Sequence, residues 1–297
     1  MPGFFYFGVF NMAYETELGN FAVPTDEISV GISRALVKTA VMPSLIYSED
    51  IPKAGNVKNF RKDGSLTAEA ISQSSSYSFS ASSELTQAVV AATIAKTVVV
   101  SKLTLEALKM GGVDANLPNL QRKQAEAISR ILDTEILALF PNLGTGVTAT
   151  NVMTINDLFT AIMNIEVGLG GGARMIYAGG AKQIKEMKVE QLTSGAAIWS
   201  QPQRSTLLAG ALGDVGLKGE VGGALCYQVS GLSTSGGDDV SAVFNPDIAF
   251  AAAYDRMIEV WSVDVVSGGF YKEIGSAFFH KAVEWNEVAA EKILSDT

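Results

Sequence analysis

The stretch IAKTVVVSKLTLEAL, Ile94 to Leu108, joins a run of β-branched residues to a segment with helical spacing. Valine, isoleucine and threonine favour strands because their branched side chains pack well on a pleated surface. The dense run of these residues and alanine over 86–100 therefore predicts a buried strand. Leu103 to Met110 has the spacing of a short helix, and Gly111-Gly112 predicts where that helix ends.

Two longer helices are predicted downstream. Residues 116–140 hold the longest helical pattern, whose apolar stripe consists of Ile128, Ile131, Leu132, Ile136 and Leu139. Thr154-Ile155-Asn156-Asp157 has the form of a capping box, which predicts the start of a second helix. That helix should end at Gly168–Gly172 and bury Ile155, Leu158, Phe159, Ile162 and Ile165.

The remaining segments mix both kinds of element. The patterns predict helices at 28–36, 181–189 and 281–295, and strands at 174–178, 225–232, 257–266 and within 268–280. The alanine-rich segment 248–254 fits either a helix or a tightly packed segment. Because helices and strands alternate without regular βαβ spacing, the predicted fold class is α+β.

A projecting β-ribbon is predicted at 51–85. Tyr77, Phe79 and Ala81 alternate with serines, which is the period of a strand with one apolar face. The alternative is a flexible serine-rich linker. The segment also carries four basic residues close together, and we expect them to contact an acidic neighbouring subunit: Lys53, Lys58, Arg61 and Lys62.

Residues 1–28 are predicted to form an arm. The apolar run near its start is only seven residues long, whereas a membrane span needs about 20. No basic residue precedes this run, so it lacks the charged region of a signal peptide. We expect the arm to bury its aromatic side chains against a partner: Phe4, Phe5, Phe7 and Phe10. Met12 is an alternative start of the chain.

Composition argues against several classes of protein. The 297 residues carry 22 basic and 31 acidic side chains, which gives a net charge of −9. The sequence has no basic run of the kind that binds phosphates, so direct binding of nucleic acid is disfavoured. Only 18% of the residues are charged and 47% are apolar, which suits a protein that buries surface against neighbours. One cysteine and one histidine cannot build a His/Cys zinc site or an intrachain disulfide.

No motif predicts a catalytic, cofactor or metal site. Gly168–Ala173 and Gly144–Ala149 match a dinucleotide-binding pattern, but each is expected to follow a helix, whereas that site needs a strand before the loop. His280, the single histidine, is predicted to sit at a strand-to-helix junction without acting as a base. We therefore expect a chain that is not an enzyme.

The order of these elements resembles the Hong Kong 97 type coat proteins of tailed bacteriophages. The match with the family's exit from its extended loop rests on Ile94 to Leu108, and 116–140 resembles its spine helix. Thr154 to Lys188 resembles the start of its axial domain, and Phe244 to Val260 the return to its peripheral domain.

The resemblance implies a division of the chain along these lines: an arm at 1–28, a peripheral domain at 29–50, 86–145 and 240–297, an extended loop at 51–85, and an axial domain at 146–239. It also implies a major capsid protein whose pentamers and hexamers close an icosahedral shell around double-stranded DNA, without sequence-specific binding.

The implied partners are further copies of the chain, a separate scaffolding protein, a portal and a decoration or cement protein, with assembly in the host cytoplasm and a place in the virion. No membrane or cofactor is implied. Two alternatives remain: an encapsulin-type compartment with the same fold, and a small-molecule enzyme that uses the glycine loop at 168–172.

Overall fold

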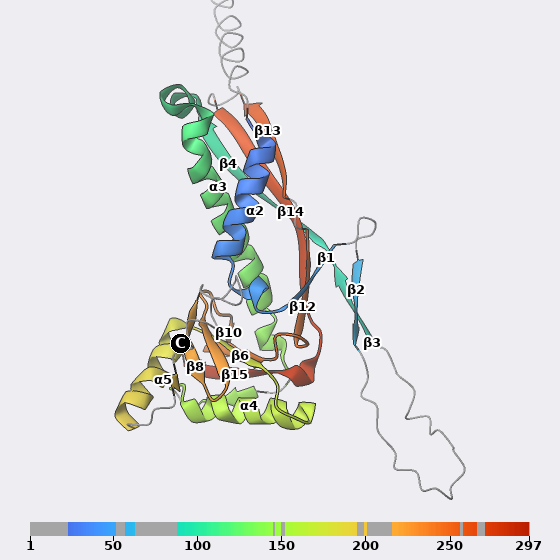
Figure 1. Cartoon of the computed structure of the whole chain (residues 1–297), viewed down its shortest axis with the longest axis vertical. Coiled ribbons are helices and arrows are strands. Elements are labelled where there is room, and N and C mark those ends of the chain that lie inside the picture. The colour runs from blue at the N-terminus through green and yellow to red at the C-terminus, as the bar shows by residue number, and fades with distance from the viewer. Residues whose placement is uncertain are drawn as a thin grey trace, which may run out of the picture.

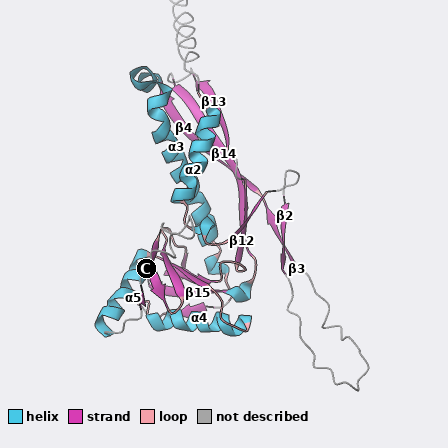
Figure 2. Ribbon diagram, in the orientation of Figure 1, coloured by secondary structure: helices cyan, strands magenta, loops and turns pink. Residues whose placement is uncertain are grey.

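The computed structural model describes residues 23–51, 57–62, 88–144, 146–149, 152–194, 199–200, 216–255, 258–265 and 271–296. The described part is elongated: two helices lie along one sheet, a second sheet with its own helices lies beyond their end, and a two-stranded ribbon projects to one side (Figure 1). Helices and strands are intermixed along the chain (Figure 2), so the predicted α+β class is confirmed.

The first sheet has five strands around the long strand β14 (Tyr271–Glu284). One edge of β14 pairs with β4 (Ala95–Thr104), and the other pairs first with β13 (Glu259–Val265) and then with β12 (Phe250–Tyr254). Strand β1 (Tyr47–Asp50) pairs in parallel with β12. Helices α2 (Thr25–Thr39) and α3 (Leu105–Leu137) cover one face of this sheet, and their shared core includes Ile28, Ile32, Leu120, Ile128, Leu132, Ile274 and Phe278.

The second sheet has eight strands and carries two helices on one face. Its strands, in spatial order, are β5 (Gly146–Thr148), β15 (Ala290–Asp296), β11 (Asp238–Phe244), β6 (Met175–Gly179), β9 (Ala224–Gln228), β8 (Leu217–Val221) and β7 (Trp199–Ser200), with β10 (Thr234–Ser235) beside β11. Helices α4 (Ile155–Leu169) and α5 (Ala181–Ser194) share a buried cluster with this sheet.

An aromatic cluster joins the two sheets. Phe140 lies in the 3-10 turn η3 (Phe140–Asn142), just after α3, and its ring centroid is 6.2 Å from that of Phe244 and 5.7 Å from that of Phe250. Phe244 ends β11 and Phe250 begins β12, so each sheet contributes one ring. Two further 3-10 turns, η1 (Met42–Ser44) and η4 (Glu287–Ala289), supply Met42 and Ala289 to the same core.

The ribbon consists of β2 (Val57–Lys62) and β3 (Ala88–Thr93), paired antiparallel with Val57 opposite Thr93. Its described part therefore includes residues beyond 85, the end expected for it. The alternation at Tyr77, Phe79 and Ala81 lies outside the described residues. The predicted boundary at 240 likewise falls inside β11, and β15 lies in the eight-stranded sheet although 240–297 was assigned to the other domain.

Several sequence predictions are confirmed. Helix α2 spans the predicted segment 28–36, and α5 spans 181–189. The capping box is present, since the Thr154 hydroxyl accepts from the Asp157 amide and the Asp157 carboxylate accepts from the Thr154 amide. Helix α4 ends as predicted, because Gly170 is left-handed with φ 74°. Phe159 alone of the predicted buried set is exposed.

The prediction of two helices across 103–140 was wrong, because α3 is one helix. Gly111 and Gly112, the predicted helix end, fall within the unbroken span of α3. Pro118 lies inside α3, and the Asn116 side chain donates to the Ala107 carbonyl at 3.3 Å across nine positions. Since nine residues of a straight helix rise about 13 Å, the helix bends here rather than ends.

The predicted terminal helix at 281–295 was also wrong. Strand β14 continues to Glu284, and β15 pairs with β11 from Ala290 opposite Phe244. Both faces of β15 pack against apolar clusters, through Ala290 on one side and Ile293 on the other. A strand buried on both faces loses the alternation that identifies strands in a sequence.

Two other predictions need correction. The segment at 248–254 is tightly packed but forms strand β12, not a helix. The run at 86–100 forms two strands, β3 and β4, which meet at Ile94, and β4 is exposed along one face. Within the described residues, no helix combines the length and apolar content that a membrane span requires.

Candidate assembly surfaces

The base of the ribbon carries the predicted basic residues that the structure describes. Lys58 and Arg61 lie on β2, where Lys58 is half-buried and Arg61 is exposed. Lys62 ends the same strand. Lys53 and the arm residues Phe4, Phe5, Phe7 and Phe10 lie outside the described residues. The structure therefore brings together Lys58, Arg61 and Lys62 on one strand.

Lys58 pairs within its own chain. Its ammonium group forms an ion pair with the Glu49 carboxylate on β1, and the Tyr47 hydroxyl donates to the same carboxylate. These hydrogen bonds, that from Lys58 first, lower the pKa of Glu49 below its usual value. Lys58 is therefore paired within its own chain at the base of the ribbon. Among the side chains of β2 that the structure describes, the exposed cation is Arg61.

Aromatic side chains fix the ribbon to the body of the molecule. Phe60 is 2% exposed and packs with Ala92, Ala251 and Ala253. Trp285 follows β14, and its indole nitrogen donates to the Arg61 carbonyl at 2.9 Å. The indole also contacts Tyr47, with ring centroids 5.1 Å apart. Sequence reasoning missed this anchor because its members are up to 238 positions apart.

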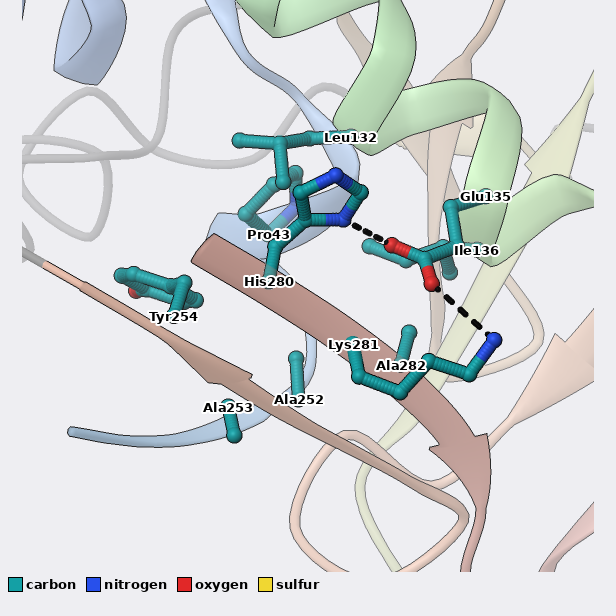
Figure 3. A pocket seen from close by; sticks show the side chains of 10 residues that line it. All are labelled: Pro43, Leu132, Glu135, Ile136, Ala252, Ala253, Tyr254, His280, Lys281 and Ala282. Atoms are coloured by element: carbon teal, nitrogen blue, oxygen red, sulfur yellow. Dashed lines mark hydrogen bonds and ion pairs between the residues drawn. The ribbon is translucent and has the colours of Figure 1, made fainter. Parts of the chain in front are cut away.

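A second polar cluster ties α3 to the first sheet (Figure 3). His280 points from β14 toward Glu135 of α3, and its Nδ1 donates to the Glu135 carboxylate. Its Nε2 lies 2.8 Å from the Thr97 hydroxyl oxygen on β4, and its ring stacks on Phe278 at 4.6 Å. Lys281 reaches the other Glu135 oxygen at 3.3 Å.

The contacts of this cluster connect α3 to the first sheet and stabilise the charged form of Glu135. Burial alone would raise the pKa of Glu135, but the hydrogen bond from His280, its charge and the amide of Ala282 together lower it. The adjoining cavity measures about 10 Å³, too small for a substrate. His280 lies inside β14, so its predicted position at a strand-to-helix junction was wrong.

The glycine segment at 168–172 begins in the last turn of α4, which ends at Leu169, and leads into β6. A dinucleotide site needs the reverse order, in which a strand precedes the loop and a helix N-terminus meets the phosphates. Among the described residues, no three histidine, cysteine or acidic side chains gather as metal ligands would.

Large apolar side chains are exposed on several elements. On the first sheet they line the face opposite α2 and α3, where Trp261 lies over Gly275 so closely that any side chain at 275 would collide with the indole. The exposed valines of that sheet are Val98, Val100 and Val263. Further exposed residues lie on the ribbon (Val57 and Val89), on α4 (Phe159, Met163 and Val167) and on α5 (Val189 and Leu192).

Comparisons with known proteins match the fold but not the sequence. No family model matches the chain, and no curated protein matches it. A structure of the capsid of Ralstonia phage GP4 matches with a TM-score of 0.66 and 10% identity, over 85% of this chain and 87% of that one.

Two further structures match the chain to a similar extent. The capsid structure of the cyanophage P-SCSP1u matches with a TM-score of 0.61 and 14% identity, over 87% of this chain and 89% of the other. A structure of Mycobacterium phage Che8 matches with a TM-score of 0.58 and 14% identity, over 86% and 90%. The chain therefore has the Hong Kong 97 type fold of tailed-phage capsid proteins, as the order of its sequence elements predicted.

Proposed function

We propose that the chain is a major capsid protein whose copies form pentamers and hexamers and close an icosahedral shell around phage double-stranded DNA. The observation that carries the proposal is the likeness to phage capsid structures over 85% or more of both chains. In this role the protein resides in the virion after assembly in the host cytoplasm.

The charge and surface of the chain support this role. Exposed apolar side chains on the first sheet, on helices α4 and α5 and on the ribbon supply area for contacts between copies. The net charge of −9 suits a container filled with DNA, because a strongly basic lining would hold the incoming strand. We also propose a scaffolding protein, a portal and a decoration protein as partners. We propose a division into arm, peripheral domain, extended loop and axial domain in which β3 belongs to the extended loop, and β11 and β15 belong to the axial domain with the rest of their sheet.

The ribbon is proposed as one contact between copies. Lys53, Arg61 and Lys62 would meet an acidic neighbouring surface, whereas Lys58 serves the base of the ribbon through Glu49. Each exposed pair contributes about 0.2–1 kcal/mol, and a shell repeats the contact in every subunit. Arg61→Glu with Lys62→Glu should therefore weaken assembly at low salt and leave the melting temperature unchanged.

The control is Arg34→Glu, which reverses an exposed cation on α2, away from the ribbon. Unimpaired assembly of the double ribbon variant at low salt would contradict the ribbon contact.

The arm is proposed as a second contact through Phe4, Phe5, Phe7 and Phe10. Limited proteolysis should remove it from free subunits and spare it in shells, and equal cleavage in both states would contradict the role.

Negative-stain microscopy with light scattering tests the function as a whole. The purified chain, alone or with a scaffolding protein, should form closed shells or rings. Monomers at every concentration tested, with and without that protein, would refute the proposal. Shells that co-purify with a protein cargo would favour an encapsulin-type compartment instead of a DNA container.

A further inference from the structure

Helix α4 carries an apolar stripe that the described part of its own chain leaves uncovered. Phe159, Met163 and Val167 recur every four residues and are 38%, 55% and 78% exposed. Residues four apart share one side of a helix. The side of α4 that faces the eight-stranded sheet is buried through Leu158, Ile162 and Ile165. The exposed stripe lies beside it, so α4 is apolar on two sides.

Phe159, at the N-terminal end of this stripe, is held in place by a close contact. The Phe159 ring lies against Gly222 in the turn between β8 and β9, where a side chain would collide with it. Gly222 has a positive φ of 58°, a conformation that favours glycine. The ring is therefore positioned before any partner arrives, which lowers the entropic cost of binding.

Helix α5 carries a second, separate stripe. Lys185, Val189 and Leu192 share its outer side, and Val189 and Leu192 are 50% and 84% exposed. Gln183, Ile184 and Met187 occupy the buried side. Leu192 is thus among the most exposed apolar side chains of the described chain, on a helix whose other side is well packed.

The two stripes differ in charge. The ionisable residues of α4 are both acidic, and Glu166 borders its stripe. On α5, the carboxylates of Glu186 and Glu190 turn inward and accept from backbone amides at the start of α4, at 2.9 and 2.7 Å. The exposed side of α5 carries Lys185, with Lys182 and Lys188 on either side of it. An apolar and acidic stripe on one helix therefore matches an apolar and basic stripe on the other.

Two different complementary surfaces on one chain fit a head-to-tail contact. A two-fold dimer uses the same patch on both copies, whereas a ring joins one patch to a different patch of the next copy. We infer that the α4 stripe of one copy packs on the α5 stripe of the next copy around the capsomer ring, with Glu166 facing Lys185. The inference rests on the proposed shell function and names the contact that closes each ring.

Cysteine cross-linking in assembled particles tests this contact. Cys226 is fully buried, so thiols introduced on the surface should react alone. Particles of the Met163→Cys, Val189→Cys chain, treated with a short bis-maleimide, should give a ladder of linked chains up to the ring size. Each single variant should give no ladder, because equivalent positions do not meet in a head-to-tail ring. The control pair Met163→Cys with Val263→Cys should also give none.

Several outcomes would overturn the inference. They are ladders from either single variant, no ladder from the paired variant in intact particles, and thiols at 163 and 189 that fail to react because another part of the same chain covers them. Particles that never form from the wild-type chain would instead count against the shell function, which separates the two failures.

Charge reversal gives a second, independent measurement. Glu166→Lys and Lys185→Glu should each raise the protein concentration needed for assembly about 2- to 5-fold, the range expected for one exposed ion pair. The double reversal should return that concentration close to the wild-type value. A double variant that assembles worse than either single variant would contradict the pairing of α4 with α5.

Discussion

The carboxylate of Glu135 is expected to hold the long helix α3 on its sheet. It accepts from His280 Nδ1, and the Lys281 ammonium lies 3.3 Å from it (Figure 3). It also accepts from the Ala282 amide. The Glu135 and His280 side chains are 17% and 7% exposed, so neither interacts freely with water. Removing one member of such a pair leaves a buried polar group without its partner.

Glu135→Ala should therefore cost about 3 kcal/mol, the lower end of the range for breaking a buried pair. The lower end applies because Lys281 is 38% exposed and its share is screened by solvent. With a urea slope of about 3 kcal/mol per molar, the unfolding midpoint of the unassembled chain should fall by roughly 1 M. Glu126→Ala, an exposed substitution on the same helix, should cost less than ~0.5 kcal/mol.

The difference in stability between the wild type and Glu135→Ala should also depend on pH. The folded pKa of Glu135 lies below its usual value, so its contribution is present above the unfolded pKa of about 4.3. It is lost as pH falls through the lower, folded pKa. Urea curves at pH 7 and in acid should show the gap between wild type and Glu135→Ala closing in acid. Equal midpoints for the two alanine variants at pH 7 would refute this reasoning.

Three further predictions concern stability and reactivity. Thr154→Ala should lose about 1 kcal/mol in urea unfolding, and Thr154→Ser should retain it, because the capping box needs a hydroxyl; equal losses would contradict the cap. Gly170→Ala should cost about 1 kcal/mol, whereas Gly171→Ala should cost little, because an added methyl group meets nothing at either site and only Gly170 has a positive φ. Burial raises the pKa of the Cys226 thiol to about 12, so maleimide should label it only after unfolding; rapid labelling of the folded chain would count against its position.

Local signals account for the elements that the sequence predicts well. Helices α2 and α4 each bury one stripe, so their periodicity survives in the fold. The capping box at Thr154 needs only residues within one turn, and the glycine end of α4 needs only Gly170. These features depend on the chain close to them and on little else.

Long-range contacts account for the elements that were missed. Strand β15 is buried on both faces between clusters from distant segments, so its own residues do not alternate. His280 and Glu135 are 145 positions apart, and nothing near either residue indicates the other. The anchor of the ribbon, formed by Phe60 and Trp285, likewise exists only once β14 has placed Trp285 beside β2.

Cryo-electron microscopy of particles formed by the purified chain tests the central claim most directly. A reconstruction should show a closed icosahedral shell of pentamers and hexamers, with the fold described here in every subunit. Within each ring, α4 of one copy should lie against α5 of the next. A chain that stays monomeric under all assembly conditions, or particles whose subunits lack this fold, would contradict the account.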